Sequence, residues 1–407
     1  MEKANKNTHL KHLEDNIFLD HIDGTREAIK FIREFRDVLK GHADRVGGGA
    51  SVKWDGAPAI WIGPHPESGK FFVAKKSLFN KIRPLFYTNI KEIENSNDLG
   101  DALKDKFKLA FNKYKNAGLR QIIQGDFLFD SSDLKYEQIE GERYLIFQPN
   151  TIVYAMPANS DMARKLDGMD MGIVWHTSYS GGTIDKLTAK AGVQTLPKAP
   201  IGVWQIGADL PDMSGAASLT KNEGKAIDKE LTNIGFHFRQ VSRATFDKLN
   251  DPVIAALCTT YTNSFVRANQ TPTPEEAAQG LPKFITEKFE AEVAKRKTAA
   301  AQNRQREALK AAIDPIMSVP KNELLSMFHL YYSLQRAKNI LVDKLSQAGF
   351  IKTFLKTTDG WKVTAHEGFV ATDKLKQNTL KLVDRLEFSY ANFSDDVIKG
   401  WESDLRR

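Results

Sequence analysis

The sequence contains almost no cysteine. A single residue, Cys258, stands among 407, which excludes an intrachain disulfide and a zinc site built from cysteine ligands. No apolar run is long enough to cross a membrane, and the polar segment 1–9 does not resemble a signal peptide. Internal repeats and low-complexity tracts are also lacking. These absences predict a soluble cytoplasmic protein that does not contact a membrane, located in the host cytoplasm if the protein is viral.

The composition predicts a folded chain with an anionic partner. The length indicates two or three domains, and a hydrophobic fraction of 41% is enough for a substantial core. The formal net charge is +7 and the pI is about 9.1. This balance favours nucleic acid or a nucleotide as the partner, although a basic protein need not bind either.

The stretch 51–62 contains the most distinctive local pattern, Lys53-Trp54-Asp55-Gly56. The spacing predicts a strand that ends near Lys53, a turn at Asp55-Gly56 and a second apolar strand over 59–62. A lysine held at a strand end among apolar neighbours loses its proton more readily, and the neutral amine is a nucleophile. The alternative is an ordinary hairpin with an exposed lysine.

Helix and strand signals alternate in the first half of the chain. Helical spacing over 12–39, with a break at Asp23-Gly24, predicts a short helix followed by a long one. Another amphipathic helix is predicted over 98–116. Runs of aromatic and branched residues predict further strands over 71–74, 121–130, 144–147, 151–156 and 171–179. This half is expected to form a largely antiparallel sheet flanked by helices.

From residue 196 onward, helical signals dominate. A long basic helix is predicted over 282–312 and another helix over 323–348. The cations of the basic helix indicate either a solvated face or a nucleic-acid surface. Strand signals return over 360–372 and 379–388, and we expect these strands to complete the sheet begun in the first half.

The order of these motifs resembles that of the covalent nucleotidyltransferase superfamily, which contains ATP-dependent DNA and RNA ligases and mRNA capping enzymes. Lys53-Trp54-Asp55-Gly56 is similar to its Lys-x-Asp-Gly nucleophile motif, and Glu367-Gly368-Phe369-Val370 to its Glu-Gly-hydrophobic motif. The other similar segments are Lys75-Lys76-Ser77, Gly125-Asp126-Phe127-Leu128, Gly172-Ile173-Val174-Trp175-His176 and Leu380-Lys381-Leu382-Val383. The resemblance covers 50–180 and 360–390, and some uncharacterised proteins of large tailed phages share this arrangement.

The resemblance implies roles for individual residues. Lys53 is the expected nucleophile that forms lysyl-AMP from ATP, and Lys381 is the expected catalytic cation near the phosphorus. Asp126 and Glu367 are expected to hold Mg²⁺ or Mn²⁺. The residues expected to bind the nucleotide are Asp55, Gly56, Lys76, Asp126, Trp175 and Glu367. Trp175 would stack on the base. Each of these residues also has a purely structural interpretation: Trp175 fits a core position, Glu367-Gly368 fits a turn, and Lys381 fits an exposed position on a strand.

Three positions depart from the family pattern. Ser51 stands where ligases commonly carry an acid, Asp126 replaces a glutamate, and the last motif has one lysine, with Arg385 as a substitute for the second. These changes affect base recognition and the metal and phosphate contacts. The sequence also ends about two dozen residues after Lys381, too few for the OB domain usual in DNA ligases and capping enzymes.

The sequence therefore predicts an α+β fold with an ATP-grasp-like nucleotidyltransferase domain of antiparallel sheets and an inserted helical module. Residues 1–49 are expected to pack on the catalytic domain, 50–195 to form its first part, 196–355 to form the module and 356–407 to complete the domain. The expected function is an ATP-dependent polynucleotide ligase that joins RNA rather than DNA.

Two other functions stay open. One is a nucleotidyltransferase that acts on a protein or a small molecule, because its first chemical step would be the same. The other is a non-catalytic nucleic-acid-binding protein on the same fold, which the substitutions at Ser51 and Asp126 motivate.

Overall fold

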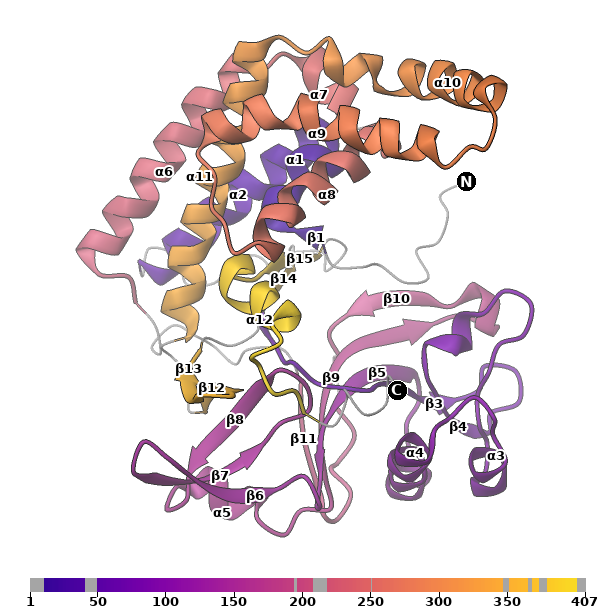
Figure 1. Cartoon of the computed structure of the whole chain (residues 1–407). Helices are drawn as coiled ribbons and strands as arrows, with labels where there is room; N and C mark the ends of the chain where they lie inside the picture. The colour runs from indigo at the N-terminus through magenta and orange to yellow at the C-terminus, as the bar shows by residue number, and fades with distance from the viewer. Residues whose placement is uncertain are drawn as a thin grey trace.

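The computed structural model describes residues 11–40, 50–193, 196–207, 218–249, 251–346, 351–364, 368–372 and 379–400. A bundle of helices forms the upper part of Figure 1, two sheets form the lower part, and a small sheet lies between them. The chain is an α+β protein, as the sequence predicts. Among the described residues, no helix is both long and apolar enough to cross a membrane.

The helical bundle is organised around α11 (Lys321–Ser346), which contacts α2, α6 and α9. Its residues Phe328, Leu334 and Leu341 have no exposed surface. The other helices of the bundle are α1 (Asn16–Leu19), α2 (His21–Leu39), α6 (Lys221–Gln240), α7 (Arg243–Leu249), α8 (Pro252–Arg267), α9 (Pro274–Ala294) and α10 (Ala299–Met317). Apolar residues from all of these helices share one core. α10 contributes Ile316 to it, with Ile313 packed against it.

The single basic helix predicted over 282–312 is wrong, because the chain forms two helices there. α9 begins at Thr273, whose side chain and that of Glu276 cap each other's backbone N–H groups. α10 begins at Thr298, whose hydroxyl accepts a hydrogen bond from the Ala301 N–H. α9 ends at Ala294, four residues before this cap, and Pro315 lies inside α10.

The N-terminal helices also differ from the prediction. The break falls at Asp20, and α2 continues through Gly24. A Cβ atom at Gly24 would lie 2.4 Å from the Asp20 Cβ atom and 2.9 Å from the Asn16 carbonyl oxygen, so glycine permits close packing of α1 on α2. The expected packing of residues 1–49 on the catalytic domain is replaced, over 13–39, by packing inside the helical bundle.

The large sheet has the strand order β10-β9-β5-β3-β4, with β11 added parallel to β9. Its strands are β3 (Ala59–Pro64), β4 (Phe71–Ala74), β5 (Ile122–Asp130), β9 (Met171–Ser180), β10 (Thr188–Ala191) and β11 (Val203–Gly207). The helices α3 (Ile90–Glu94) and α4 (Asp101–Tyr114) cover one face, where Phe107 and Tyr114 are buried. The predicted strands and the helix over 98–116 are thus present, with ends shifted by a few residues.

The side sheet has the order β13-β12-β8-β7-β6. Its strands are β6 (Lys135–Ile139), β7 (Glu142–Phe147), β8 (Ile152–Pro157), β12 (Lys352–Thr357) and β13 (Gly360–Val363), with the short helix α5 (Asp161–Leu166) beside them. A shared core of Trp54, Phe129, Phe147 and Tyr154 joins this sheet to the large one. Because β11 and β12 belong to sheets, the helical module is 218–346 in the described residues, shorter than the predicted 196–355.

The small sheet unites segments from both ends of the sequence. Its order is β1-β15-β14-β2, from β1 (Lys11–His12), β2 (Ala50–Lys53), β14 (Gly368–Thr372) and β15 (Thr379–Leu382). The strands predicted over 360–372 and 379–388 therefore divide: β14 and β15 join β2, while β13 extends the side sheet. A turn of π-helix (Arg385–Ser389) and α12 (Tyr390–Phe393) follow β15 and lie below the bundle in Figure 1.

A buried group of charges connects the start of the chain, α11 and the segment after β15. Lys338 lies 2.8 Å from Glu14, and both side chains are fully buried. Arg385 donates hydrogen bonds to Asp15 at 2.8 Å and to the Tyr331 hydroxyl at 2.7 Å. Burial alone would raise the pKa of Glu14, but the charges of Lys338 and Arg385 hold that pKa below its ordinary value. Burial raises the pKa of Asp15 despite the charge of Arg385. In their ordinary charge states, the two acids and two bases of the group balance.

Removal of Lys338 alone should destabilise the fold. Lys338→Met leaves a net negative charge buried around Glu14, and we expect a loss of about 3–5 kcal/mol in the free energy of unfolding. The double variant Glu14→Leu/Lys338→Met restores neutrality and should recover most of that loss. Thermal and urea unfolding of both variants measure the difference. A double variant no more stable than Lys338→Met would show that the balance of charge is not what matters.

Candidate active site

Lys53 is the last residue of β2, and its side chain is partly buried. Gly368 lies opposite it on β14, while Lys381 of β15 lies opposite Val370, which is itself opposite Ser51. From ordinary strand spacing, the Cα atoms of Lys53 and Lys381 are roughly 12 Å apart. The register thus brings the two predicted catalytic lysines into one sheet. The predicted ligand Glu367 lies outside the described residues, directly before Gly368.

The residue after Lys53 anchors the loop on the side sheet. Trp54 is buried, with its ring centroid 4.9 Å from that of Tyr154 and 6.1 Å from that of Trp204. The Tyr154 hydroxyl accepts a hydrogen bond of 2.7 Å from the Asp55 N–H. The backbone directly after Lys53 is therefore held by aromatic packing and a buried hydrogen bond.

Asp55 has a structural role in this fold. Its carboxylate accepts hydrogen bonds from the N–H groups of Thr151 at 2.7 Å and Ile152 at 2.9 Å, and from the Asn150 side chain at 2.9 Å. Burial raises the pKa of Asp55, although these donors and the nearby charge of Lys53 oppose the rise. The side chain predicted to bind the nucleotide is thus occupied in fastening the Lys53 loop to the start of β8.

Gly56 brings the loop against Asp126 of β5. A Cβ atom on Gly56 would lie 2.7 Å from the Asp126 Cβ atom and 2.9 Å from the Phe127 carbonyl oxygen. The next residue, Ala57, donates a backbone hydrogen bond of 2.8 Å to that same carbonyl. Only glycine fits this approach without displacement of the backbone. Lys53 and Asp126, far apart in sequence, therefore belong to adjoining segments.

Asp126 faces His176 rather than Trp175. The Nε2 atom of His176 lies 3.5 Å from Oδ2 of Asp126, and both side chains are about one quarter exposed. Trp175 points to the opposite face of β9, where it is fully buried, donates to Gln205 and packs edge-on against Tyr114. The structure thus does not bring the Trp175 ring to the Asp126 side of the sheet. His176 is the functional candidate that sequence reasoning passed over, although it stands in the same motif.

Lys75 and Lys76, which follow β4, lie at the same end of the large sheet as Asp126. Ala74 is opposite Trp61 in the register, so the chain after it continues toward Ala59, which lies opposite Asp126. Lys75 turns away and donates to the carbonyl oxygen of Asp98, whereas Lys76 is exposed. Lys76 is thus the more exposed cation of this pair.

Arg385, the suggested substitute for a second lysine in the last motif, belongs to the buried charge group with Asp15. It has almost no exposed surface and does not serve as a phosphate contact. Within the described residues, no three His, Cys, Asp or Glu side chains gather as metal ligands. Asp126 supplies one partly exposed carboxylate, which suits Mg²⁺ because that ion uses one or two carboxylates together with substrate phosphates.

Variants of Asp55 should separate its structural role from ligand binding. Asp55→Ala leaves the Thr151 and Ile152 N–H groups without acceptors, and we expect a loss of about 2–6 kcal/mol in stability. Asp55→Asn is the matched control, because its amide oxygen can accept both N–H groups while the Asn150 amide turns over; it should cost less than about 1 kcal/mol. Thermal unfolding measures both. An Asp55→Ala protein that melts like the wild type would contradict the structural role.

Comparisons with known proteins place the chain in a family without assigning an activity. No curated protein matches the chain, and no solved structure matches it. A model of a protein family of unknown function matches residues 7–396, which is nearly the whole chain and includes every predicted site residue. The chain therefore belongs to the family of unknown function DUF6267.

Proposed function

We propose that this protein is a covalent nucleotidyltransferase, and specifically an ATP-dependent polynucleotide ligase that joins RNA. The observation that carries the proposal is the pairing of β2 with β14, which sets Gly368 opposite Lys53 and places the Lys381 strand next in the same sheet. The packing of Gly56 on Asp126 adds a carboxylate beside the same loop. A nucleophile, a second cation and a carboxylate are the groups that nucleotidyl transfer requires.

The proposed reaction begins at the Lys53 amine. The unprotonated Nζ atom attacks the α-phosphorus of ATP, an N–P bond forms, and the bond to the leaving pyrophosphate breaks. A 5′-phosphate oxygen then attacks the same phosphorus, and the N–P bond breaks as the lysine nitrogen recovers a proton. The 3′-hydroxyl finally attacks the 5′-phosphate of the adenylated end, and AMP leaves. Lys381 and Lys76 would offset negative charge during these steps, and bound Mg²⁺ or Mn²⁺ would screen the phosphates.

Incubation with ATP labelled at the α-phosphate tests the first step. We expect label to remain on the protein in a denaturing gel when Mg²⁺ is present, and to fall to background in Lys53→Ala because the attacking nitrogen is lost. Lys91→Ala, an exposed lysine on α3, is the matched control and should label normally. Absence of label on the wild type, or equal label on Lys53→Ala, would contradict the proposal. Nicked RNA and DNA duplexes then identify the acceptor.

Asp126 and His176 should affect the same assay to different extents. If Asp126 holds the metal, Asp126→Asn should slow labelling by about 10²-fold, because one charged oxygen ligand is lost. His176→Gln should slow it by about 10-fold, because a group that orients a ligand acts indirectly. Asp161→Asn changes a fully exposed carboxylate on α5 and serves as the control. Normal rates in both site variants would remove Asp126 from the proposed site.

A further inference from the structure

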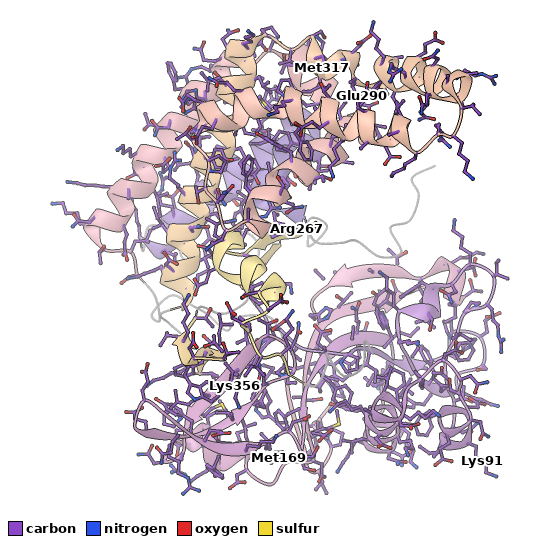
Figure 2. All side chains as sticks on the ribbon, in the orientation of Figure 1. Lys91, Met169, Arg267, Glu290, Met317 and Lys356 are labelled. Atoms are coloured by element: carbon purple, nitrogen blue, oxygen red, sulfur yellow. The ribbon has the colours of Figure 1, made fainter. Side chains whose placement is uncertain are left out.

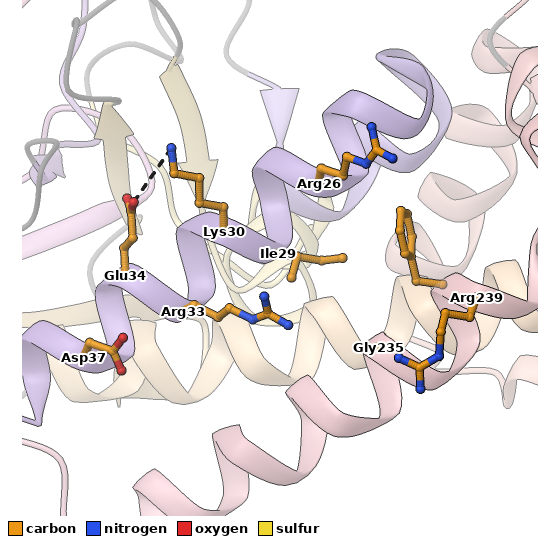
Figure 3. Close-up of a pocket in the computed structure, with 9 residues that line it drawn as sticks. Arg26, Ile29, Lys30, Arg33, Glu34, Asp37, Gly235 and Arg239 are labelled. Carbon is orange, nitrogen blue, oxygen red and sulfur yellow. Dashed lines mark ion pairs between the residues drawn. The ribbon is translucent and has the colours of Figure 1, made fainter.

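A second basic surface lies in the helical bundle, away from Lys53. A groove of about 570 Å³ runs between α2 and α6. Figure 3 shows Ile29 and Arg33 pointing from α2 toward α6, while Arg239 lies near Gly235 on α6. Ile29 is mostly buried and belongs to the bundle core, so the groove has an apolar floor with cationic walls.

The acids near the groove pair with some of its cations but not with all of them: Arg26 lies 3.0 Å from Asp23. Glu34 lies 3.8 Å from Lys30, and Asp37 lies 2.7 Å from Arg36, so each acid has a partner on α2 itself. Within the described part of the chain, no carboxylate lies within 4 Å of the Arg33 or Arg239 guanidinium groups. Both arginines are exposed. The groove therefore presents two cations whose charge no neighbouring acid neutralises.

The bundle's other basic region also contains ion pairs. On the hairpin of α9 and α10, Arg306 lies 3.0 Å from Glu290, and Lys295 pairs with Glu292. Figure 2 labels Glu290 on this hairpin, at the opposite side of the bundle from α6. Arg306 and Lys295 of this hairpin thus have acid partners, as Arg26 and Lys30 of the groove do, whereas Arg33 and Arg239 of the groove do not among the residues that the structure describes.

We propose that the groove between α2 and α6 binds the phosphodiester backbone of a nucleic acid. Arg26, Lys30 and Arg33 follow one another at spacings of four and three residues, which places them along one side of α2. The three cations span roughly 10 Å of helix. One strand of a duplex carries about three phosphates over that length, and Arg239 adds a cation from the facing helix. Guanidinium groups suit phosphate because they donate two parallel hydrogen bonds.

The proposal rests on the proposed function only for the choice of nucleic acid over another polyanion. A ligase must hold a long strand while a small site acts on its end, and a groove remote from the nucleophile can supply that binding. Transfer of AMP to Lys53 needs ATP and a divalent metal but no nucleic acid. Variants that no longer bind RNA in the groove should therefore still label Lys53 with AMP. If the wild type does not label, RNA binding by the groove is still measured by its own assay.

Gly235 offers the sharpest test. A Cβ atom there would meet only the end of the Arg239 side chain, at 3.8 Å, so a larger residue fits without backbone movement. Gly235→Glu places a negative charge beside Arg239, whereas Gly235→Gln adds the same bulk without charge. We expect the dissociation constant for fluorescently labelled RNA to rise at least tenfold in Gly235→Glu and less than twofold in Gly235→Gln. Equal binding by these two variants would overturn the proposal.

The salt dependence of binding gives an independent measurement. Each phosphate contact contributes to the slope of log K against log salt, so Arg33→Gln/Arg239→Gln should reduce that slope by about 2. Lys91→Gln/Lys283→Gln removes the same charge from exposed positions on α3 and α9 and should leave the slope nearly unchanged; Figure 2 shows Lys91 at the far end of the molecule. Equal slopes in the two double variants, or stronger competition by an acidic peptide than by RNA, would overturn the proposal.

Discussion

Backbone hydrogen bonds between β2 and β14 are the contact on which the rest of the structure depends. They join residues 50–53 to residues 368–371, and helices α6 to α11 and both larger sheets lie between these segments in the sequence. β15 and β1 complete the same small sheet, and α11 contacts β14 and β15. Because the entropic cost of closing a loop grows only slowly with its length, a long helical insertion is compatible with this pairing. The small sheet thus connects the bundle to the strand that carries Lys53.

The segment that carries Lys53, the proposed nucleophile, is firmly attached to both larger sheets. Trp54 and Asp55 fix the loop to Tyr154 and to the N–H groups at the start of β8, and Gly56 fixes it to β5. Under the proposed function, such a loop would hold the Lys53 amine in one place, and catalysis depends on the alignment of the reacting atoms. The aspartate of the motif therefore fixes the position of its neighbours, and its carboxylate accepts hydrogen bonds from Asn150, Thr151 and Ile152.

Residue type alone predicted most of the strands, because short runs of aromatic and branched residues bounded by glycine or proline favour strands. Helix ends were harder to place. At Thr298, a side-chain cap divides what reads as one helix, and at Gly24 a glycine that reads as a break is a point of close packing. The packing of α1 and α2 in the bundle was also missed, since an amphipathic helix shows that one face is buried but not which element buries it.

In the candidate site, too, some features could be predicted from the sequence and others depend on tertiary contacts. Lys53, Asp126 and the order of the motifs were visible in the chain, because they depend on local residue patterns. The choice between Trp175 and His176 was not, because neighbouring strand residues point to opposite faces and only the pairing with β5 decides which face meets Asp126. The burial of Arg385 beside Asp15, and the meeting of α2 with α6 at a basic groove, likewise arise from contacts between distant segments. The sequence by itself therefore determines which reactive and polar residues occur in each local motif. The partners of each side chain are decided by how distant segments of the chain pack together.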